Sequence, residues 1–295
     1  MATNLGPLGV WSFVDALDAT GAAEFARRLE TWGYGALWVP EAVGRDPFAI
    51  IAWMAAHTTT LVFCTGIANI YARDPMTMKG IRKTLGEMAP GRFVMGLGVS
   101  HAHLVQKVRG HDYSNKPVST MRAYLEGMEK ALYMGPEPAE EPPIVLAALR
   151  TNMLKLAAEK TRGAHPYFVT PAHTAKARAT LGKDAWLCPE QMVLHETDPA
   201  QARAVARKHM AIYLGLPNYQ NNLLELGFTA EDFANGGSDR IVDAIVAWGD
   251  VDTIRARIAA HHAAGADHVC IQPFRPDGET GADLDLLERL APAHA

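Results

Sequence analysis

Short apolar runs that alternate with helical patterns constrain the fold of this chain more than any other feature. Eight runs predict strands, at residues 7–11, 36–40, 61–66, 93–97, 144–148, 163–168, 186–194 and 267–272. Most of them are apolar throughout, as expected for parallel strands that helices cover on the outside. Eight strand–helix units favour a closed (β/α)8 TIM barrel, because open doubly wound sheets usually have about five or six strands.

The predicted helices have residues at their ends that suit helix boundaries. Asp46-Pro47 and Asp74-Pro75 each place a capping carboxylate before a proline, and Gly33 suits the end of the first helix. Further helices are expected at about 21–32, 121–133, 152–160, 251–264 and 282–291.

The segment 199–248 departs from this rhythm. It starts with a helical pattern and then becomes rich in asparagine and glycine, so it is interpreted as an insertion after strand seven. No linker divides the chain and its composition does not change along its length. We therefore expect a single domain over residues 1–295.

The composition excludes several classes of protein. The formal net charge is −4 and the basic residues are scattered, so we expect no nucleic-acid partner. No apolar run is long enough to span a membrane, and residues 1–13 lack the pattern of a secretory signal. Cys64, Cys188 and Cys270 lie far apart in apolar segments, which predicts buried free thiols in a cytoplasmic protein.

The stretch RFVMGLGVSH, residues 92–101, tests a nucleotide-binding alternative. A dinucleotide fingerprint needs G-x-G-x-x-G between the first strand and a helix, but here the third glycine is missing and the strand is the fourth. In a barrel, residues 93–97 would be a strand of the barrel wall. Gly98 to His101 would then lie at the carboxyl end of that strand, on the lip of the barrel where active sites are built. Small residues at this lip would let a planar ligand approach the backbone closely.

Six motifs occur in order along the chain: GALWVPE (35–41), TGIAN (65–69), YARDP (71–75), GRFVMGLGV (91–99), LAAL (146–149) and GAHP (163–166). Together they resemble the luciferase-like flavin and deazaflavin oxidoreductases, especially the branch that uses coenzyme F420. The resemblance implies a barrel with an insertion after strand seven, a cofactor ring across its mouth, and a homodimer. It also implies a non-proline cis peptide at Gly66-Ile67 or one residue to either side.

The resemblance and the residue types together predict the cofactor-binding residues. The helix after strand five opens with Arg150, Thr151, Asn152 and Met153. A helix start with free N–H groups suits a phosphate, and the family uses this loop and that of Gly163, Ala164 and His165 for the phosphate of the cofactor. Ring contacts are expected from Gly66, Ile67, Ala68, Asn69, Gly98 and Ser100. The amide of Asn69 can both donate and accept a hydrogen bond.

Glu41 and His101 are the candidate catalytic residues. In a relative that oxidises a sugar phosphate, the acid that matches Glu41 is followed by a catalytic histidine, whereas Ala42 follows here. His101 lies where that relative carries a catalytic glutamate, and a histidine can exchange a proton with a substrate near neutral pH. The alternatives are a helix cap or ion pair for Glu41 and packing for His101. No metal site is predicted, because no further ligands complete the H-x-H of residues 101–103.

The motifs indicate an oxidoreductase whose cofactor supplies the reactivity, since no G-x-S-x-G elbow and no cysteine–base pair occurs at a lip. The favoured function is hydride transfer between C5 of coenzyme F420 and a small organic substrate. The alternatives are an FMN-dependent luciferase-like monooxygenase and a non-catalytic flavin- or deazaflavin-binding barrel. Segments 218–237 and 100–119 are expected to select the substrate.

Overall fold

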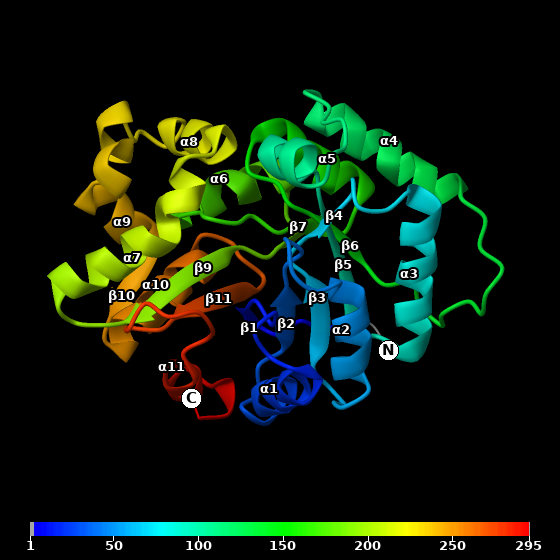
Figure 1. Cartoon of the computed structure of the whole chain (residues 1–295), viewed down its shortest axis with the longest axis horizontal. Coiled ribbons are helices and arrows are strands. Elements are labelled where there is room, and N and C mark those ends of the chain that lie inside the picture. Colours follow the sequence, from blue (N-terminus) through cyan, green and yellow to red (C-terminus); the bar gives the residue numbers. More distant parts are fainter. Residues whose placement is uncertain (1–2, 295) are drawn as a thin grey trace.

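Parallel strands curl into a half-barrel with helices on its outside in the computed structural model, which describes residues 3–294 (Figure 1). The strands are β1 (Leu8–Trp11), β2 (Ala36–Val39), β3 (Val62–Thr65), β4 (Ala68–Asn69), β5 (Phe93–Gly98), β6 (Ile144–Leu146), β7 (Gly163–Ala164), β8 (Trp186–Leu187), β9 (Glu190–His195), β10 (Val246–Gly249) and β11 (Val269–Phe274). Hydrogen-bonded neighbours follow the order β10-β9-β11-β1-β2-β3-β5-β6-β7-β8, and β4 pairs with β5. Because all these pairs are parallel, the carboxyl ends of the strands lie on one side.

Helices connect most of the strands and cover the convex side of the sheet. They are α1 (Ala19–Thr31), α2 (Pro47–Ala55), α3 (Pro75–Met88), α4 (Pro117–Lys130), α5 (Thr151–Lys160), α6 (Pro171–Leu181), α7 (Pro199–Leu214), α8 (Pro217–Leu224), α9 (Asp239–Ile245), α10 (Val251–Ala263) and α11 (Leu284–Arg289). Asp46 and Asp74 cap α2 and α3 as predicted, each accepting two backbone N–H groups. No helix in residues 3–294 is long and apolar enough to cross a membrane.

The predicted count of eight strands is wrong, because two short strands were missed and one predicted run is divided. The run 186–194 forms β8 and β9 on either side of Cys188-Pro189, and proline has no N–H to donate. Pairing nevertheless continues past this break, since the Glu190 N–H donates to the Pro166 carbonyl at 2.9 Å. The run 186–195 therefore pairs with β7 at its start and with β11 further on.

The predicted strand at 163–168 is also shorter than expected. Only Gly163 and Ala164 pair as strand, and the chain then turns away through Pro166 to Phe168. Phe168 has a φ of +60°, a left-handed conformation that is rare for a bulky residue. The segment that follows β7 therefore leaves the wall at the carboxyl end of the sheet.

The segment 199–248 is mostly helical but ends in a strand. It contains α7, α8, the 3-10 turn Ala230–Gly236 and α9, and then β10, which pairs in parallel with β9. Figure 1 shows these helices grouped beside β9 and β10. The apolar run IVDAIVAW, residues 241–248, contains both the end of α9 and most of β10, and its pattern does not distinguish helix from strand.

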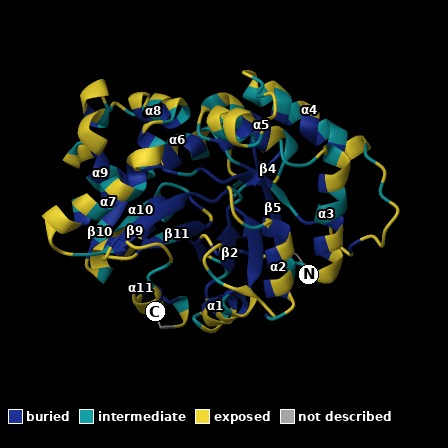
Figure 2. Ribbon diagram, in the orientation of Figure 1, coloured by how far each residue is buried: buried dark blue, intermediate teal, exposed yellow. Residues whose placement is uncertain are grey.

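Buried residues follow the strands of the sheet, whereas exposed residues lie on the helices and loops around it (Figure 2). The buried side chains form separate clusters on the two faces of the sheet. Leu37 and Phe63 belong to the cluster that includes the outer helices. Their neighbours Trp38 and Cys64 belong to a cluster that contains no helix residue, so it fills the concave side. All three cysteines are buried and free, as predicted. A third cluster joins α7, α8 and α9 to β9, β10 and β11.

Candidate active site at the carboxyl ends of the strands

Gly66 and Ile67 follow β3 and are joined by a cis peptide bond, at the predicted position. The Gly66 carbonyl accepts a hydrogen bond from Trp11 Nε1 at 2.8 Å. Gly98 ends β5 directly against Ile67, because a Cβ built at Gly98 would lie 2.4 Å from Ile67 Cδ1. A larger residue at position 98 would require the Ile67 side chain to move, so the ends of β3 and β5 are in close contact at the mouth.

Glu41 follows β2 and is enclosed by positive charge. Arg73 Nη1 lies 2.9 Å and 3.0 Å from its two carboxylate oxygens, and the Asn69 N–H donates to Oε2 at 2.8 Å. Arg109 Nη2 lies 3.5 Å from Oε1. Arg73 also pairs with Asp46, so it is not free to bind a ligand. This arrangement is the ion pair that was the alternative to a catalytic Glu41, and the catalytic role stays a prediction.

Asn69 has a side chain that is only partly satisfied. Its Oδ1 accepts the Tyr71 N–H at 2.9 Å, but its Nδ2 has no hydrogen-bond partner among the described residues although it is buried. A buried amide nitrogen without a partner is rare in proteins, because leaving it unpaired costs about 1–3 kcal/mol. Nδ2 is therefore available to a ligand at the mouth.

His101 lies just beyond β5 and contacts the helical segment 199–248. Its ring centroid is 5.7 Å from that of Tyr219 on α8. Burial alone lowers the pKa of His101, so the imidazole is neutral at pH 7 and can accept a proton. The preceding Ser100 has a φ of +57°, a backbone conformation that residues other than glycine rarely adopt outside functional or tightly held sites.

Beyond His101, residues 103–108 form a short π-helix where the sequence suggested a loop. The π-helix is followed by Arg109, whose Nη2 donates to the Ala42 carbonyl at 2.9 Å. The segment that carries His101 is thereby joined to the Glu41 side of the mouth.

A group of tyrosines at the mouth was missed by the sequence analysis. The Tyr167 hydroxyl hydrogen-bonds to the Tyr213 hydroxyl and donates to Gln272 Oε1, both at 2.8 Å. Tyr219 packs against Tyr167, Tyr213 and Phe168, with ring centroids 5.3–6.3 Å apart. Because these residues come from the chain after β7, from α7 and from α8, no local motif could have signalled their contact.

Glu190 is a buried carboxyl group beneath this aromatic group. Its Oε2 accepts the N–H of the left-handed Phe168 at 3.2 Å, whereas Oε1 has no partner within residues 3–294. Burial raises the pKa of Glu190 to about 8, despite the opposing hydrogen bond from Phe168, so the group is largely neutral at pH 7. Glu190 thus anchors the backbone where the chain leaves the wall.

The start of α5 is arranged to bind an anion. Arg150 is its N-cap residue and makes no side-chain cap within the described chain, so the N–H groups of Thr151 and Asn152 lack a capping partner. Arg150 Nε donates to Glu225 Oε1 at 2.8 Å, and Lys176 Nζ to Oε2 at 2.6 Å. The hydrogen bond from Lys176, followed by that from Arg150, holds the pKa of Glu225 below its usual range. Met153, also predicted, lies half-buried on α5.

Gly163, Ala164 and His165 are placed differently from the other predicted cofactor residues. Gly163 and Ala164 are buried in β7. His165 stacks on Trp38 on the concave side, with ring centroids 4.2 Å apart, and its Nδ1 is 2.8 Å from the Cys188 carbonyl. Burial lowers the pKa of His165 to about 4. The structure therefore does not bring these residues to the exposed start of α5, and their cofactor role stays a prediction.

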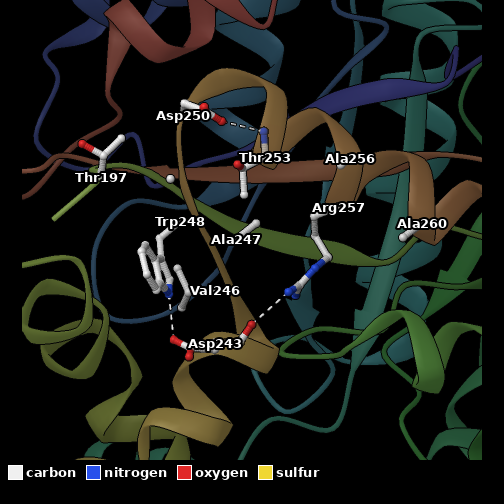
Figure 3. Close-up of a pocket in the computed structure, with 11 residues that line it drawn as sticks. Thr197, Asp243, Val246, Ala247, Trp248, Asp250, Thr253, Ala256, Arg257 and Ala260 are labelled. Carbon is white, nitrogen blue, oxygen red and sulfur yellow. Dashed lines mark hydrogen bonds between the residues drawn. The ribbon is translucent and has the colours of Figure 1, made fainter. Parts of the chain in front are cut away.

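A cavity of about 640 Å³ lies at β10 and α10 rather than among the predicted site residues (Figure 3). Most of its polar side chains are engaged with one another or with backbone. Trp248 Nε1 donates to Asp243 Oδ1 at 2.8 Å, and Arg257 Nη2 donates to the Asp243 carbonyl at 2.9 Å. Asp250 caps α10. Because these groups are already satisfied, we place the candidate site at the mouth.

Comparison with known proteins agrees with the geometry. The family model for luciferase-like monooxygenases matches residues 9–268. A candidate coenzyme F420-dependent oxidoreductase of Mycobacterium tuberculosis is 25% identical over 320 aligned residues, which cover 88% of this chain and 91% of that protein.

Two solved structures share the fold. The F420-dependent tetrahydromethanopterin reductase of Methanopyrus kandleri has a TM-score of 0.76 at 17% identity, and 99% of each chain is covered. The oxygenating component of 3,6-diketocamphane monooxygenase from Pseudomonas putida, solved with FMN, has a TM-score of 0.69 at 14% identity and covers 97% of this chain and 98% of that one. With a curled parallel sheet, a polar mouth and a family match over most of its length, this chain belongs to the luciferase-like monooxygenase family of oxidoreductases.

Proposed function

We propose that this chain is a coenzyme F420-dependent oxidoreductase that transfers a hydride between C5 of the deazaflavin and a small organic substrate. The observation that carries the proposal is a neutral His101 at the same mouth as an anion-ready start of α5. The Mycobacterium tuberculosis relative, whose name includes coenzyme F420, adds support from sequence.

The side chains at the mouth fit a planar, anionic cofactor. The unpartnered Nδ2 of Asn69 offers a donor to the edge of a ring, and Gly98 leaves the end of β5 without a side chain. Arg150 and the N–H groups of Thr151 and Asn152 would hold a phosphate at the start of α5. Bound in this way, the cofactor supplies the carbon that accepts or releases the hydride.

His101 is the residue proposed to move the proton. When a substrate alcohol carbon gives up a hydride, its hydroxyl must also lose a proton, and a neutral imidazole can accept it. In the reverse direction the imidazolium returns that proton to the carbonyl oxygen. Tyr219 and Phe168 would exclude water from this exchange, since both are buried beside the mouth.

The finer architecture is part of the same proposal. The run 186–195 would close the half-barrel into a (β/α)8 barrel, with residues 199–248 as an insertion after the seventh strand of a single domain. A homodimer in the cytoplasm stays a prediction from the sequence. Light scattering of the purified protein and cell fractionation would check the two expectations.

The experiment that tests the function is titration of the purified protein with F420 and, separately, with FMN, followed by fluorescence. We expect F420 to bind, and Arg150→Ala to weaken binding by roughly tenfold, because a charge-assisted hydrogen bond is lost. Lys155→Ala is the matched control, since Lys155 is an exposed cation on the same helix away from its start.

Other outcomes of the titration would contradict the proposal. Tight binding of FMN with no binding of F420 would assign the chain to the FMN-dependent monooxygenase alternative. Binding of F420 without turnover of any alcohol or ketone in a substrate screen would favour a non-catalytic barrel. An equal loss of affinity in the Arg150 and Lys155 variants would contradict the proposal that the phosphate binds at the start of α5.

A further inference from the structure

α8 has a polar residue on its buried face that the fold does not explain. Asn222 is fully buried, yet neither its Oδ1 nor its Nδ2 has a hydrogen-bond partner in the described part of the chain. It lies one turn after Tyr219, which packs over the mouth, and one turn before Glu225. A buried amide with both atoms unpaired is rare and requires an explanation such as a ligand.

Glu225, one turn further along, lies beside the start of α5, where it binds the side chain of the N-cap residue Arg150. Its two carboxylate oxygens accept from Arg150 and from Lys176 on α6, at 2.8 Å and 2.6 Å. A carboxylate held by two cations beside a helix start has the charge and hydrogen-bonding pattern of a bound phosphate. The chain therefore places one of its own anions on Arg150, the cation that is proposed to bind the cofactor phosphate.

We infer that α8 forms the third wall of this anion subsite, with Asn222 as a ligand-binding residue and Glu225 as an internal anion that the phosphate of the cofactor displaces from Arg150 and Lys176. The inference rests on the proposed function and deepens it, because it adds Lys176, Asn222 and Glu225 to the subsite. It also gives α8 two states. In one, Glu225 is paired with Arg150 and Lys176, an arrangement that we call the latch. In the other, these ion pairs are broken and α8 contacts the ligand.

The exposure of the latch makes this exchange possible. The side chains of Glu225 and Lys176 are about one-third exposed, and that of Arg150 is about half exposed. Exposed ion pairs are weak because water competes for both charges. A phosphate, with more negative charge and more acceptor oxygens than a carboxylate, can replace Glu225 without leaving a buried cation unpaired.

The test is a set of titrations at low ionic strength with F420, with FMN and with the deazaflavin–ribityl chromophore that lacks the phosphate. Glu225→Gln should lower the dissociation constant of F420 about three- to tenfold, since the internal competitor has lost its charge. Asn222→Ala should raise it about tenfold without lowering the melting temperature, because the native amide makes no hydrogen bond with any described residue of the free protein. Asn221→Ala, at the exposed neighbouring position, is the control and should change neither.

The phosphate-free chromophore separates this subsite from the ring site. Its affinity should be the same for the wild type and for Glu225→Gln. The inference is overturned if both variants bind F420 as the wild type does, or if Glu225→Gln strengthens the phosphate-free chromophore equally.

The proposed function can fail independently of this inference. If FMN binds and F420 does not, the F420 assignment is lost, and stronger FMN binding by Glu225→Gln would still support the subsite. If neither cofactor binds to the wild type or to Glu225→Gln, both the function and the subsite are overturned.

Discussion

Two carboxylates at the candidate site are each shared between two cations, but their surroundings differ. Glu41 lies between Arg73 and Arg109 with 5% of its side chain exposed, whereas Glu225 lies between Arg150 and Lys176 with 36% exposed. Breaking a buried pair strands a charge away from water, while an exposed pair is easily replaced by solvent or ligand. We therefore expect the Glu41 cluster to contribute more to stability, and we propose a ligand-responsive role for the Glu225 cluster alone.

His101 lies on the segment that joins the two clusters. The π-helix that follows His101 ends just before Arg109, which contacts Glu41 and the Ala42 carbonyl. The ring of His101 contacts Tyr219 on α8, and Glu225 directly follows that helix. Contacts therefore connect both clusters to the residue that is proposed to move the proton.

The largest effect on stability is expected from Glu41→Gln. Removing the charge leaves Arg73, which is almost buried, with Asp46 as its remaining anionic partner, so the free energy of unfolding should fall by about 1.5–3 kcal/mol. Urea denaturation followed by circular dichroism measures this change. A loss below about 1 kcal/mol would contradict this contribution to stability, and a normal fold with abolished turnover would support the predicted catalytic role of Glu41.

A large effect on activity is expected from His101→Asn. Loss of the proton acceptor should lower kcat at least about 100-fold, or roughly 2.7 kcal/mol in the barrier, with little change in F420 affinity. Steady-state assays with F420 and a substrate alcohol would measure it. The exposed His103 provides the matched control variant His103→Asn, which should retain activity. Similar losses in both variants would exclude a specific role for His101.

Glu190→Gln should change how stability depends on pH. The pKa of Glu190 is raised to about 8 in the folded protein from an ordinary value of 4.5, so the folded state binds the proton more tightly. The stability that this tighter proton binding adds is fully present below about pH 4.5 and is lost as the pH rises towards 8. Over that range the free energy of unfolding falls by at most about 1.4 kcal/mol per pH unit.

Thermal or urea unfolding of wild type and Glu190→Gln between pH 5 and 8 measures that contribution. The variant should lose less stability than the wild type over this range, because glutamine does not ionise. Parallel pH profiles for the two proteins would mean that Glu190 is already charged at neutral pH.

The smallest effect on stability is expected from Glu225→Gln. Because the pair is exposed, the free energy of unfolding should fall by less than about 1 kcal/mol in the absence of cofactor. The same urea titration that is used for Glu41→Gln allows the two clusters to be compared directly. Equal losses at the two positions would contradict the distinction between them.

The sequence predicted the features of this molecule that depend on local pattern. The apolar runs located most strands, the Asp-Pro pairs located two helix starts, and the resemblance located the cis peptide at Gly66-Ile67. Gly98 to His101 also lie at the carboxyl end of β5, as expected for a barrel lip.

The features that the sequence did not predict depend on contacts between distant residues. Arg150 and Glu225 are 75 positions apart, and Tyr167 and Gln272 are 105 positions apart. Val246–Gly249 forms a strand only because β9 offers an unpaired edge, and nothing in its apolar pattern distinguishes it from the helix before it. Nothing in the sequence around His165 predicted that its ring stacks on Trp38, which comes from β2.

A crystal structure of the protein with F420 tests the central claim most directly. The account predicts the ring at the carboxyl ends of β3 and β5, near His101, and the phosphate at the N–H groups of Thr151 and Asn152. Glu225 should have withdrawn from Arg150 and Lys176, with Asn222 facing the ligand. A phosphate bound elsewhere, with the Glu225 latch still closed, would contradict the account.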